Sequence, residues 1–211
     1  MSVRGKFLTF EGGEGAGKST QVRYLQEALE GRGIDVVVTR EPGGSPGAEE
    51  IRKLLVEGEP ERWMPLTETL LFLAARSDHI ARLIEGSLAS GKWVVCDRFS
   101  ASTLVYQGIA RGVGVETVNT LQNSIPGMIS PDLTIILDVT SEIGLARVAR
   151  RSDNVETRFE QFDKKFHDTL RNAFREYSKT LGNKCVLVDG GSSAERVARD
   201  IWKIVDERLR P

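Results

Sequence analysis

The chain alternates between short runs of consecutive apolar residues and longer stretches in which apolar residues recur every three or four positions. The short runs have the composition of buried strands and cover residues 6–10, 34–39, 92–96, 133–139 and 185–188. The longer stretches have helical spacing and cover residues 21–29, 48–56, 66–90, 100–109, 116–125, 141–151, 159–181 and a terminal segment from Ser192. Buried strands that alternate with helices predict an α/β fold with three layers, in which helices cover both faces of a five-stranded parallel sheet.

Glycine and polar residues predict where several helices begin or end. Gly31 and Gly33 follow the first helix and predict its C-terminus. Ser192 and Glu195 have the spacing of a capping box at the start of the last helix. A polar stretch interrupts the helical pattern near residues 152–157, which predicts a short lid at about 147–158 on a single domain that spans 1–211.

The segment between the first strand and the first helix has the spacing G-x-x-x-x-G-K-[ST] of a phosphate-binding loop. Its glycines allow successive N–H groups to face an anion, and the helix N-terminus adds partial positive charge. Lys18 can reach the outer phosphates and the Ser19 hydroxyl can bind Mg²⁺. A chance match is disfavoured because a strand precedes the loop and a helix follows it. We therefore predict that a nucleoside triphosphate binds to Gly12, Gly13, Glu14, Gly15, Ala16, Gly17, Lys18, Ser19 and Thr20.

Loops that follow neighbouring parallel strands meet at one edge of a sheet. The loops at 14–19, 40–47 and 97–103 should therefore face one crevice. Asp97 ends the third strand, where a carboxylate can bind Mg²⁺ directly or through water, although it could also simply cap the next helix. Arg98 can hold a phosphate with two hydrogen bonds, but alone an Asp-Arg pair is more often a surface ion pair.

Three arginines, Arg147, Arg150 and Arg151, lie near the end of one predicted helix. Basic residues in a last helical turn usually complement the helix dipole. The phosphate loop has no arginine of its own, so these side chains are also candidates for stabilising charge during catalysis from a lid.

Composition excludes several classes of protein. The 211 residues carry a formal net charge of −1, which gives no reason to expect nucleic-acid or anionic-membrane binding. No apolar run has the length of a membrane span, and the N-terminus lacks a signal-peptide pattern. Cys96 and Cys185 lie in apolar strands and are expected to be buried thiols, as in a cytoplasmic protein.

A guanine-nucleotide switch and a nucleotide-driven motor are the rival classes. Guanine-specific switches carry N-K-x-D, whereas Asn183-Lys184 is followed by Cys185-Val186 and lacks the aspartate. A motor would need further arms or linkers that the chain barely accommodates. A small phosphotransferase remains.

Over nearly its whole length the chain resembles the bacterial type of thymidylate kinase, a family of nucleoside monophosphate kinases with a phosphate loop. The motifs that carry this resemblance are Glu11-Gly12-Gly13-Glu14-Gly15-Ala16-Gly17-Lys18-Ser19, Thr39-Arg40-Glu41-Pro42-Gly43-Gly44, Leu71-Phe72-Leu73-Ala74-Ala75-Arg76, Asp97-Arg98-Phe99 and Tyr106-Gln107-Gly108. The resemblance implies transfer of the γ-phosphoryl group of ATP to dTMP, with Mg²⁺, to give dTDP and ADP. Another nucleotide or nucleoside kinase, or a non-catalytic nucleotide-binding module, is the alternative.

The resemblance also assigns roles in an acceptor pocket. Phe72 would stack on thymine, and Arg76, four residues later on the same helix face, would donate to a base carbonyl. Without the resemblance, Phe72 would be read as a core aromatic. Arg98 would hold the dTMP phosphate, and Tyr106 would crowd a 2′-hydroxyl. The other acceptor contacts that the resemblance implies are Glu14, Glu41, Pro42, Ser102, Thr103 and Gln107.

Three further expectations follow from the resemblance. The Glu41-Pro42 bond is expected to be cis, and the adenine edge is expected to meet residues 189–192. A homodimer is expected, with the helix at 66–90 as a contact surface, although its apolar stripe could equally face the core. That stripe consists of Leu70, Leu73, Ile80, Leu83 and Ile84.

Overall fold

The computed structural model describes residues 4–150 and 158–211. Within these residues, five strands form one parallel sheet in the order β2-β3-β1-β4-β5. The strands are β1 (Phe7–Glu11), β2 (Val36–Arg40), β3 (Trp93–Asp97), β4 (Leu133–Asp138) and β5 (Cys185–Asp189). The predicted parallel sheet and the positions of its strands are confirmed. Cys96 and Cys185 are buried free thiols, as predicted.

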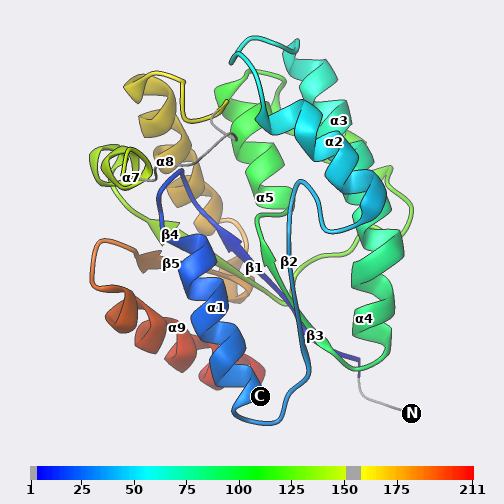
Figure 1. Ribbon diagram of the computed structural model, residues 1–211, viewed down its shortest axis with the longest axis vertical. Helices are drawn as coiled ribbons and strands as arrows, with labels where there is room; N and C mark the ends of the chain where they lie inside the picture. Colours follow the sequence, from blue (N-terminus) through cyan, green and yellow to red (C-terminus); the bar gives the residue numbers. More distant parts are fainter. Residues whose placement is uncertain (1–3, 151–157) are drawn as a thin grey trace.

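Helices cover both faces of this sheet (Figure 1). One face packs against α1 (Lys18–Glu30) and α9 (Ala194–Leu209). Its core contains Leu8, Phe10, Leu25, Leu29, Val95, Ile135, Val197, Ile201 and Val205. The other face packs against α3 (Pro65–His79), α4 (Glu85–Ala89) and α8 (Lys164–Ser178). Its core contains Phe7, Leu73, Ile84, Leu88, Val94, Phe99, Ile136, Leu170 and Phe174. The three-layer prediction is therefore confirmed.

The long helix predicted at 66–90 consists of α3, a π-helical turn η1 (Ile80–Ile84) and α4. Its stripe faces the core at Leu73, Ile80 and Ile84, whereas Leu70 is 49% exposed. Of the two alternatives for this stripe, the core holds for Leu73, Ile80 and Ile84 but not for Leu70, and the buried side of this half of α3 carries polar side chains instead. These are Glu68, Thr69 and Arg76.

The other helices are α2 (Pro46–Val56), α5 (Ser100–Thr103), which continues as the π-helical η2 (Leu104–Ala110), α6 (Val115–Asn123) and α7 (Ser141–Val148). The helix predicted at 159–181 begins later than expected. Asp163 accepts a hydrogen bond from the N–H of Phe166 (2.8 Å), so this side chain caps α8 and residues 159–163 precede the helix.

Two further helix ends differ from the prediction. The side chain of Ser193 accepts a hydrogen bond from the N–H of Arg196 and caps α9, so the predicted box of Ser192 and Glu195 is wrong by one residue. Helix α7 ends at Val148, so Arg150, which was predicted for its last turn, lies beyond its end. Among the described residues, no helix is long and apolar enough to cross a membrane.

Candidate active site

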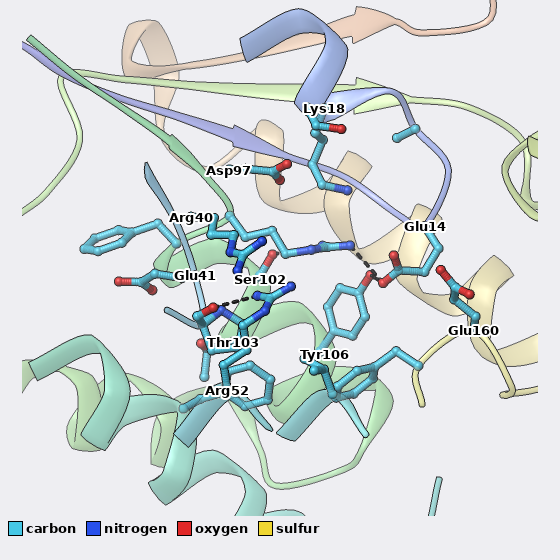
Figure 2. A pocket seen from close by; sticks show the side chains of 18 of the residues that line it. Glu14, Lys18, Arg40, Glu41, Arg52, Asp97, Ser102, Thr103, Tyr106 and Glu160 are labelled. Atoms are coloured by element: carbon cyan, nitrogen blue, oxygen red, sulfur yellow. Dashed lines mark hydrogen bonds and ion pairs between the residues drawn. The ribbon is translucent and has the colours of Figure 1, made fainter. Parts of the chain in front are cut away.

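A cavity of about 360 Å³ opens at the carboxyl ends of the strands. The loops after β1, β2 and β3 all contribute to its lining, which confirms the prediction of one shared crevice. In Figure 2, Lys18 and Asp97 enter from the side of the phosphate loop, and Thr103 and Tyr106 from the opposite side. The predicted residues that line it are Glu14, Gly15, Ala16, Gly17, Lys18, Ser19, Glu41, Pro42, Phe72, Arg76, Asp97, Arg98, Ser102, Thr103, Tyr106 and Gln107.

The phosphate loop is held in place from behind by α7. Gly15 has a φ of +66°, and a Cβ atom there would lie 2.0 Å from the carbonyl oxygen of Gly144. Only glycine fits such a backbone contact. Arg147 of α7 donates to the carbonyl oxygens of Gly15 (3.4 Å) and Gly190 (3.2 Å), so it joins the phosphate loop to the loop after β5. The contact of α7 with the loop therefore involves both backbone and side chain.

Helix α1 begins at Lys18, directly after the glycines, and no side chain caps its first turn. Its N-terminus therefore offers backbone donors to an anion. The Lys18 ammonium donates to the carbonyl oxygens of Gly12 (3.3 Å) and Gly13 (2.9 Å). Burial, and then the positive charge of Arg98, lowers the pKa of Lys18 to about 8. Gly12, Gly13 and Thr20 belong to the loop and helix but do not line the cavity.

Arg98 lies at the centre of the charged groups. Its Nη2 donates to Oε1 of Glu14 (2.8 Å), and its Nη1 donates to the carbonyl oxygen of Gly12 (2.9 Å) and to Oγ of Ser102 (3.2 Å). Its backbone has a φ of +69°, a conformation that costs energy for residues with a Cβ and that is often found at functional sites. This turn directs the guanidinium from the end of β3 toward the phosphate loop.

Glu14 is paired from two sides. Besides Arg98, the hydroxyl of Tyr106 donates to Glu14 Oε1 (2.9 Å). Burial alone would raise the pKa of Glu14, but the charges of Arg98 and Lys18 outweigh it and bring the pKa to about 2. Glu14 is thus a carboxylate across the neutral range, despite its place beside an anion-binding loop.

Glu11 is a buried acid to which sequence reasoning gave no role. Its Oε1 accepts the N–H of Phe99 (2.9 Å) and its Oε2 accepts the hydroxyl of Ser102 (2.5 Å). Burial, partly offset by these hydrogen bonds and by Arg98, raises the pKa of Glu11 to about 7. The sequence does hold one sign of a buried acid at this position, because Glu11 directly continues an apolar strand.

Arg76 is buried in a network of polar side chains. Its Nε donates to Glu41 Oε2 (2.7 Å). Its Nη1 donates to Gln122 (2.7 Å) and its Nη2 to Thr103 (2.9 Å). The other oxygen of Glu41 contacts Nδ1 of His79 (3.0 Å). The Glu41-Pro42 bond is cis, as expected. The network fixes both the guanidinium and the carboxylate at the cavity wall.

Aromatic rings form the remaining wall. Phe159 lies 6.0 Å from Phe72 and 5.6 Å from Tyr106, measured between ring centroids. Sequence reasoning placed Phe159 inside a helix and so missed it. The other cavity residues to which it gave no individual role are Arg40, Arg52, Val56, Phe99 and Glu160.

The predicted lid is described only in part. Arg150 is exposed and does not line the cavity. Arg151 and residues 152–157 lie outside the described residues. Arg147, the third arginine of this group, binds the two carbonyl oxygens named above.

Comparisons with known proteins identify close relatives. The family model for thymidylate kinase matches residues 10–201. A thymidylate kinase of Bradyrhizobium sp. (strain ORS 278) is 50% identical over 207 residues, which cover 98% of this chain and 92% of that protein. One from Ruegeria pomeroyi is 48% identical over 205 residues, which cover 97% of this chain and 96% of that protein.

A solved structure is also similar. The crystal structure of thymidylate kinase from Ehrlichia chaffeensis matches with a TM-score of 0.78 and 30% identity, and the match covers 96% of this chain and 99% of that one. The segment that the family model matches includes every residue that lines the cavity.

Proposed function

Since the chain belongs to the thymidylate kinase family, we propose that it transfers the γ-phosphoryl group of ATP to dTMP, giving dTDP and ADP. The observation that carries this proposal is that Phe72, Arg76 and Arg98 line the same cavity as Lys18. A site for a polyphosphate and a site with an aromatic ring and two arginines are therefore neighbours. Two nucleotides bound there would bring their phosphates together.

The donor phosphates bind the loop and the first turn of α1, where Lys18 neutralises the outer ones. The adenine edge meets residues 189–192. This placement is supported by Arg147, which holds the carbonyl oxygen of Gly190 beside the phosphate loop. Oxygen ligands suit Mg²⁺, and both Ser19 and Asp97 line the cavity next to Lys18. They would hold the ion, and its charge would offset that on the transferred phosphoryl group.

The acceptor lies against the opposite wall. Phe72 stacks on the thymine ring and Arg76 donates to a ring carbonyl. Thr103 and Ser102 contact base and sugar, and Tyr106 excludes a 2′-hydroxyl. Arg98 binds the acceptor phosphate, and Glu14 lies near the 3′-hydroxyl. Glu41 and Pro42 complete the wall, since Glu41 fixes Arg76.

No general base is required for this reaction. A phosphate monoester has a second pKa of about 6 and is mostly a dianion at neutral pH. The residues must therefore place two anions in line and neutralise the charge that spreads over the transferred group. Lys18 and Arg98 perform this task in the described residues, and Arg150 and Arg151 would add to it from the lid at 147–158.

A panel of acceptors tests the proposal. With ATP and Mg²⁺, dTMP should support ADP release at least tenfold faster than dCMP, AMP or thymidine. The panel also includes dUMP, which differs from dTMP only by the missing methyl group. A preference for another acceptor would favour a different nucleotide kinase. The absence of any acceptor-dependent ADP release would favour a non-catalytic nucleotide-binding module.

We also expect a cytoplasmic homodimer, as the family resemblance implies. Met64, Leu66 and Leu70 are 75%, 50% and 49% exposed near the start of α3, which supports a contact surface there. Light scattering should give twice the mass of 23.3 kDa, and Leu70→Glu should reduce it toward one copy. A monomeric unmodified chain would contradict this expectation.

A further inference from the structure

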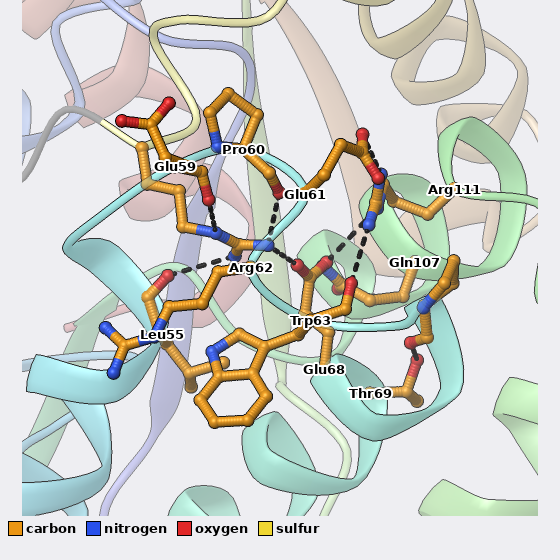
Figure 3. Close-up of polar contacts among 12 residues, drawn as sticks. Leu55, Glu59, Pro60, Glu61, Arg62, Trp63, Glu68, Thr69, Gln107 and Arg111 are labelled. Carbon is orange, nitrogen blue, oxygen red and sulfur yellow. Dashed lines mark hydrogen bonds and ion pairs between the residues drawn. The ribbon is translucent and has the colours of Figure 1, made fainter.

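Glu68 is a buried carboxylate that does not line the cavity but binds a residue that does. It lies in the first turn of α3 with 0% of its surface exposed. Figure 3 shows its carboxylate beside Gln107 and Arg111, close to the carbonyl groups of the connector between α2 and α3. Its Oε1 accepts a hydrogen bond from Nε2 of Gln107 (2.9 Å). Gln107 lies in η2 and is part of the cavity wall.

Arg158 forms a buried ion pair with Glu68. The guanidinium donates to Glu68 Oε2 and to the carbonyl oxygens of Pro60 (2.6 Å), Glu59 (3.0 Å) and Leu55 (3.1 Å). Arg158 is also fully buried. A guanidinium has only hydrogen-bond donors, so the Glu68 oxygen that faces Arg158 is an acceptor. A second guanidinium, that of Arg111, lies 3.7 Å from Glu68 Oε1.

A carboxylate can only accept hydrogen bonds. The amide of Gln107 must therefore turn its NH₂ group toward Glu68, and its oxygen takes the other side. The charge of Glu68 thus decides whether the Gln107 amide presents its oxygen or its NH₂ group to a molecule bound in the cavity. Without that charge, an amide could bind in either orientation.

We propose that Glu68 is a specificity-determining positioning residue, which fixes the Gln107 amide so that the cavity presents an acceptor oxygen to the base. This rests on the proposed function. Thymine and uracil carry an N–H at ring position 3, and such an oxygen accepts a hydrogen bond from it. Cytosine has an unprotonated acceptor nitrogen there, which the oxygen repels. Arg76 reads the neighbouring ring carbonyl, so Glu68 supplies a separate contribution to selection of the base.

The ratio of kcat/KM for dUMP to kcat/KM for dCMP measures this contribution, since the two nucleotides differ only at ring positions 3 and 4. In Glu68→Gln, the new side chain keeps an oxygen for Arg158 and turns NH₂ toward Gln107. The Gln107 amide then reverses and offers NH₂ to the base. We expect the ratio to fall about tenfold to a hundredfold, because one hydrogen bond is lost and one mismatch is relieved. The KM for ATP should change little.

The exchange Glu68→Gln with Gln107→Glu tests the same contact in reverse. The new amide at position 68 would donate to a carboxylate at position 107, whose other oxygen again faces the base as an acceptor. The ratio should return toward that of the unmodified enzyme. A matched control is Glu61→Gln, which removes the exposed ion-pair partner of Arg111 in the same cluster but does not contact Gln107. The control should leave the ratio unchanged.

A folded Glu68→Gln enzyme with an unchanged ratio would overturn the proposal. If that variant does not fold, Gln107→Met decides, because it removes the amide and leaves the pair of Glu68 and Arg158 in place. A ratio preserved in Gln107→Met would equally overturn it. If the unmodified chain phosphorylated no pyrimidine nucleotide, the proposed function would fail by itself. The same ratio, measured as dissociation constants for dUMP and dCMP by calorimetry, would then still test Glu68.

Discussion

Glu14 and Arg98 form an ion pair across the cavity, with 2.8 Å between Oε1 of the carboxylate and Nη2 of the guanidinium. One residue comes from the loop after β1 and the other from the end of β3. The pair therefore sets the distance between the loop proposed for the donor and the arginine proposed for the acceptor. It also keeps the guanidinium at the cavity wall before the acceptor arrives.

The first prediction concerns Arg98 itself. In Arg98→Lys the charge that neutralises Glu14 is kept, but the planar group that binds a phosphate through two hydrogen bonds is lost. We expect the KM for dTMP to rise about tenfold to a hundredfold, as for the loss of a charged hydrogen bond, while the KM for ATP changes little. Steady-state kinetics with each substrate varied measures both. The control is Arg175→Lys, because Arg175 is an exposed ion-pair partner of Asp138 and lies outside the cavity. An unchanged response to dTMP would contradict the role of Arg98.

The second prediction concerns the charge of Lys18. Because the pKa of Lys18 is about 8 in the free protein, its positive charge is present below that pH and is lost as pH rises through it. ATP binding should therefore weaken above pH 8 and take up protons there. Calorimetry in buffers of different ionisation enthalpy measures the uptake.

Lys18→Arg is the matched variant, because an arginine keeps its proton throughout this range. Its ATP affinity should be flat between pH 7 and 9. Lys18→Ala should lower kcat about a thousandfold without loss of the folded state, which circular dichroism checks. Near-normal turnover of Lys18→Ala would remove this residue from the catalytic group.

The third prediction concerns the metal. Removal of divalent cations by a chelator should abolish turnover, and Mg²⁺ should restore it. Asp97→Asn should raise the Mg²⁺ concentration needed for half-maximal turnover about tenfold or more. The reason is that the amide has no negative charge with which to bind the ion, either directly or through a water molecule. The control is Asp168→Asn, because Asp168 is an exposed carboxylate that binds the Ser141 hydroxyl and lies outside the cavity. An Asp97→Asn enzyme with an unaltered Mg²⁺ response would show that Asp97 serves the fold and not the ion.

The phosphate loop and the sheet could be predicted because their signals are local. The loop has a fixed spacing from Gly12 to Ser19, and buried parallel strands are continuous apolar runs. The rule that ligands collect at the carboxyl ends of strands then placed Arg98 next to Lys18 without any knowledge of contacts.

The buried polar network could not be predicted, because it depends on pairs that are far apart in the chain. Glu68 and Arg158 are ninety positions apart, and each alone is typical of an exposed helical or loop residue. The start of α8 was misplaced because Phe159 continues an apolar pattern with helical spacing. That ring packs on Phe72 and Tyr106 in the cavity wall instead of on a helix face. Tertiary contacts decided both cases.

The last prediction concerns Glu11 and stability. Burial raises the pKa of Glu11 from 4.5 to about 7 in the folded protein. Between these values the folded state holds a proton that the unfolded state has released. The stability that Glu11 contributes is therefore fully present below pH 4.5 and is lost as pH rises through 7.

Glu11→Gln removes this titration while its amide can still bind Phe99 and Ser102. Relative to the unmodified protein, the free energy of unfolding of Glu11→Gln should rise with pH by about 1.4 kcal/mol for each unit of this interval, or about 3 kcal/mol in total. Urea unfolding at pH 5, 6, 7 and 8 measures the difference. Glu27→Gln on the exposed side of α1 is the control and should show no such rise. A difference that stays constant from pH 5 to 8 would mean that Glu11 does not hold a proton in the folded protein, and that Ser102 and Phe99 bind a permanent carboxylate.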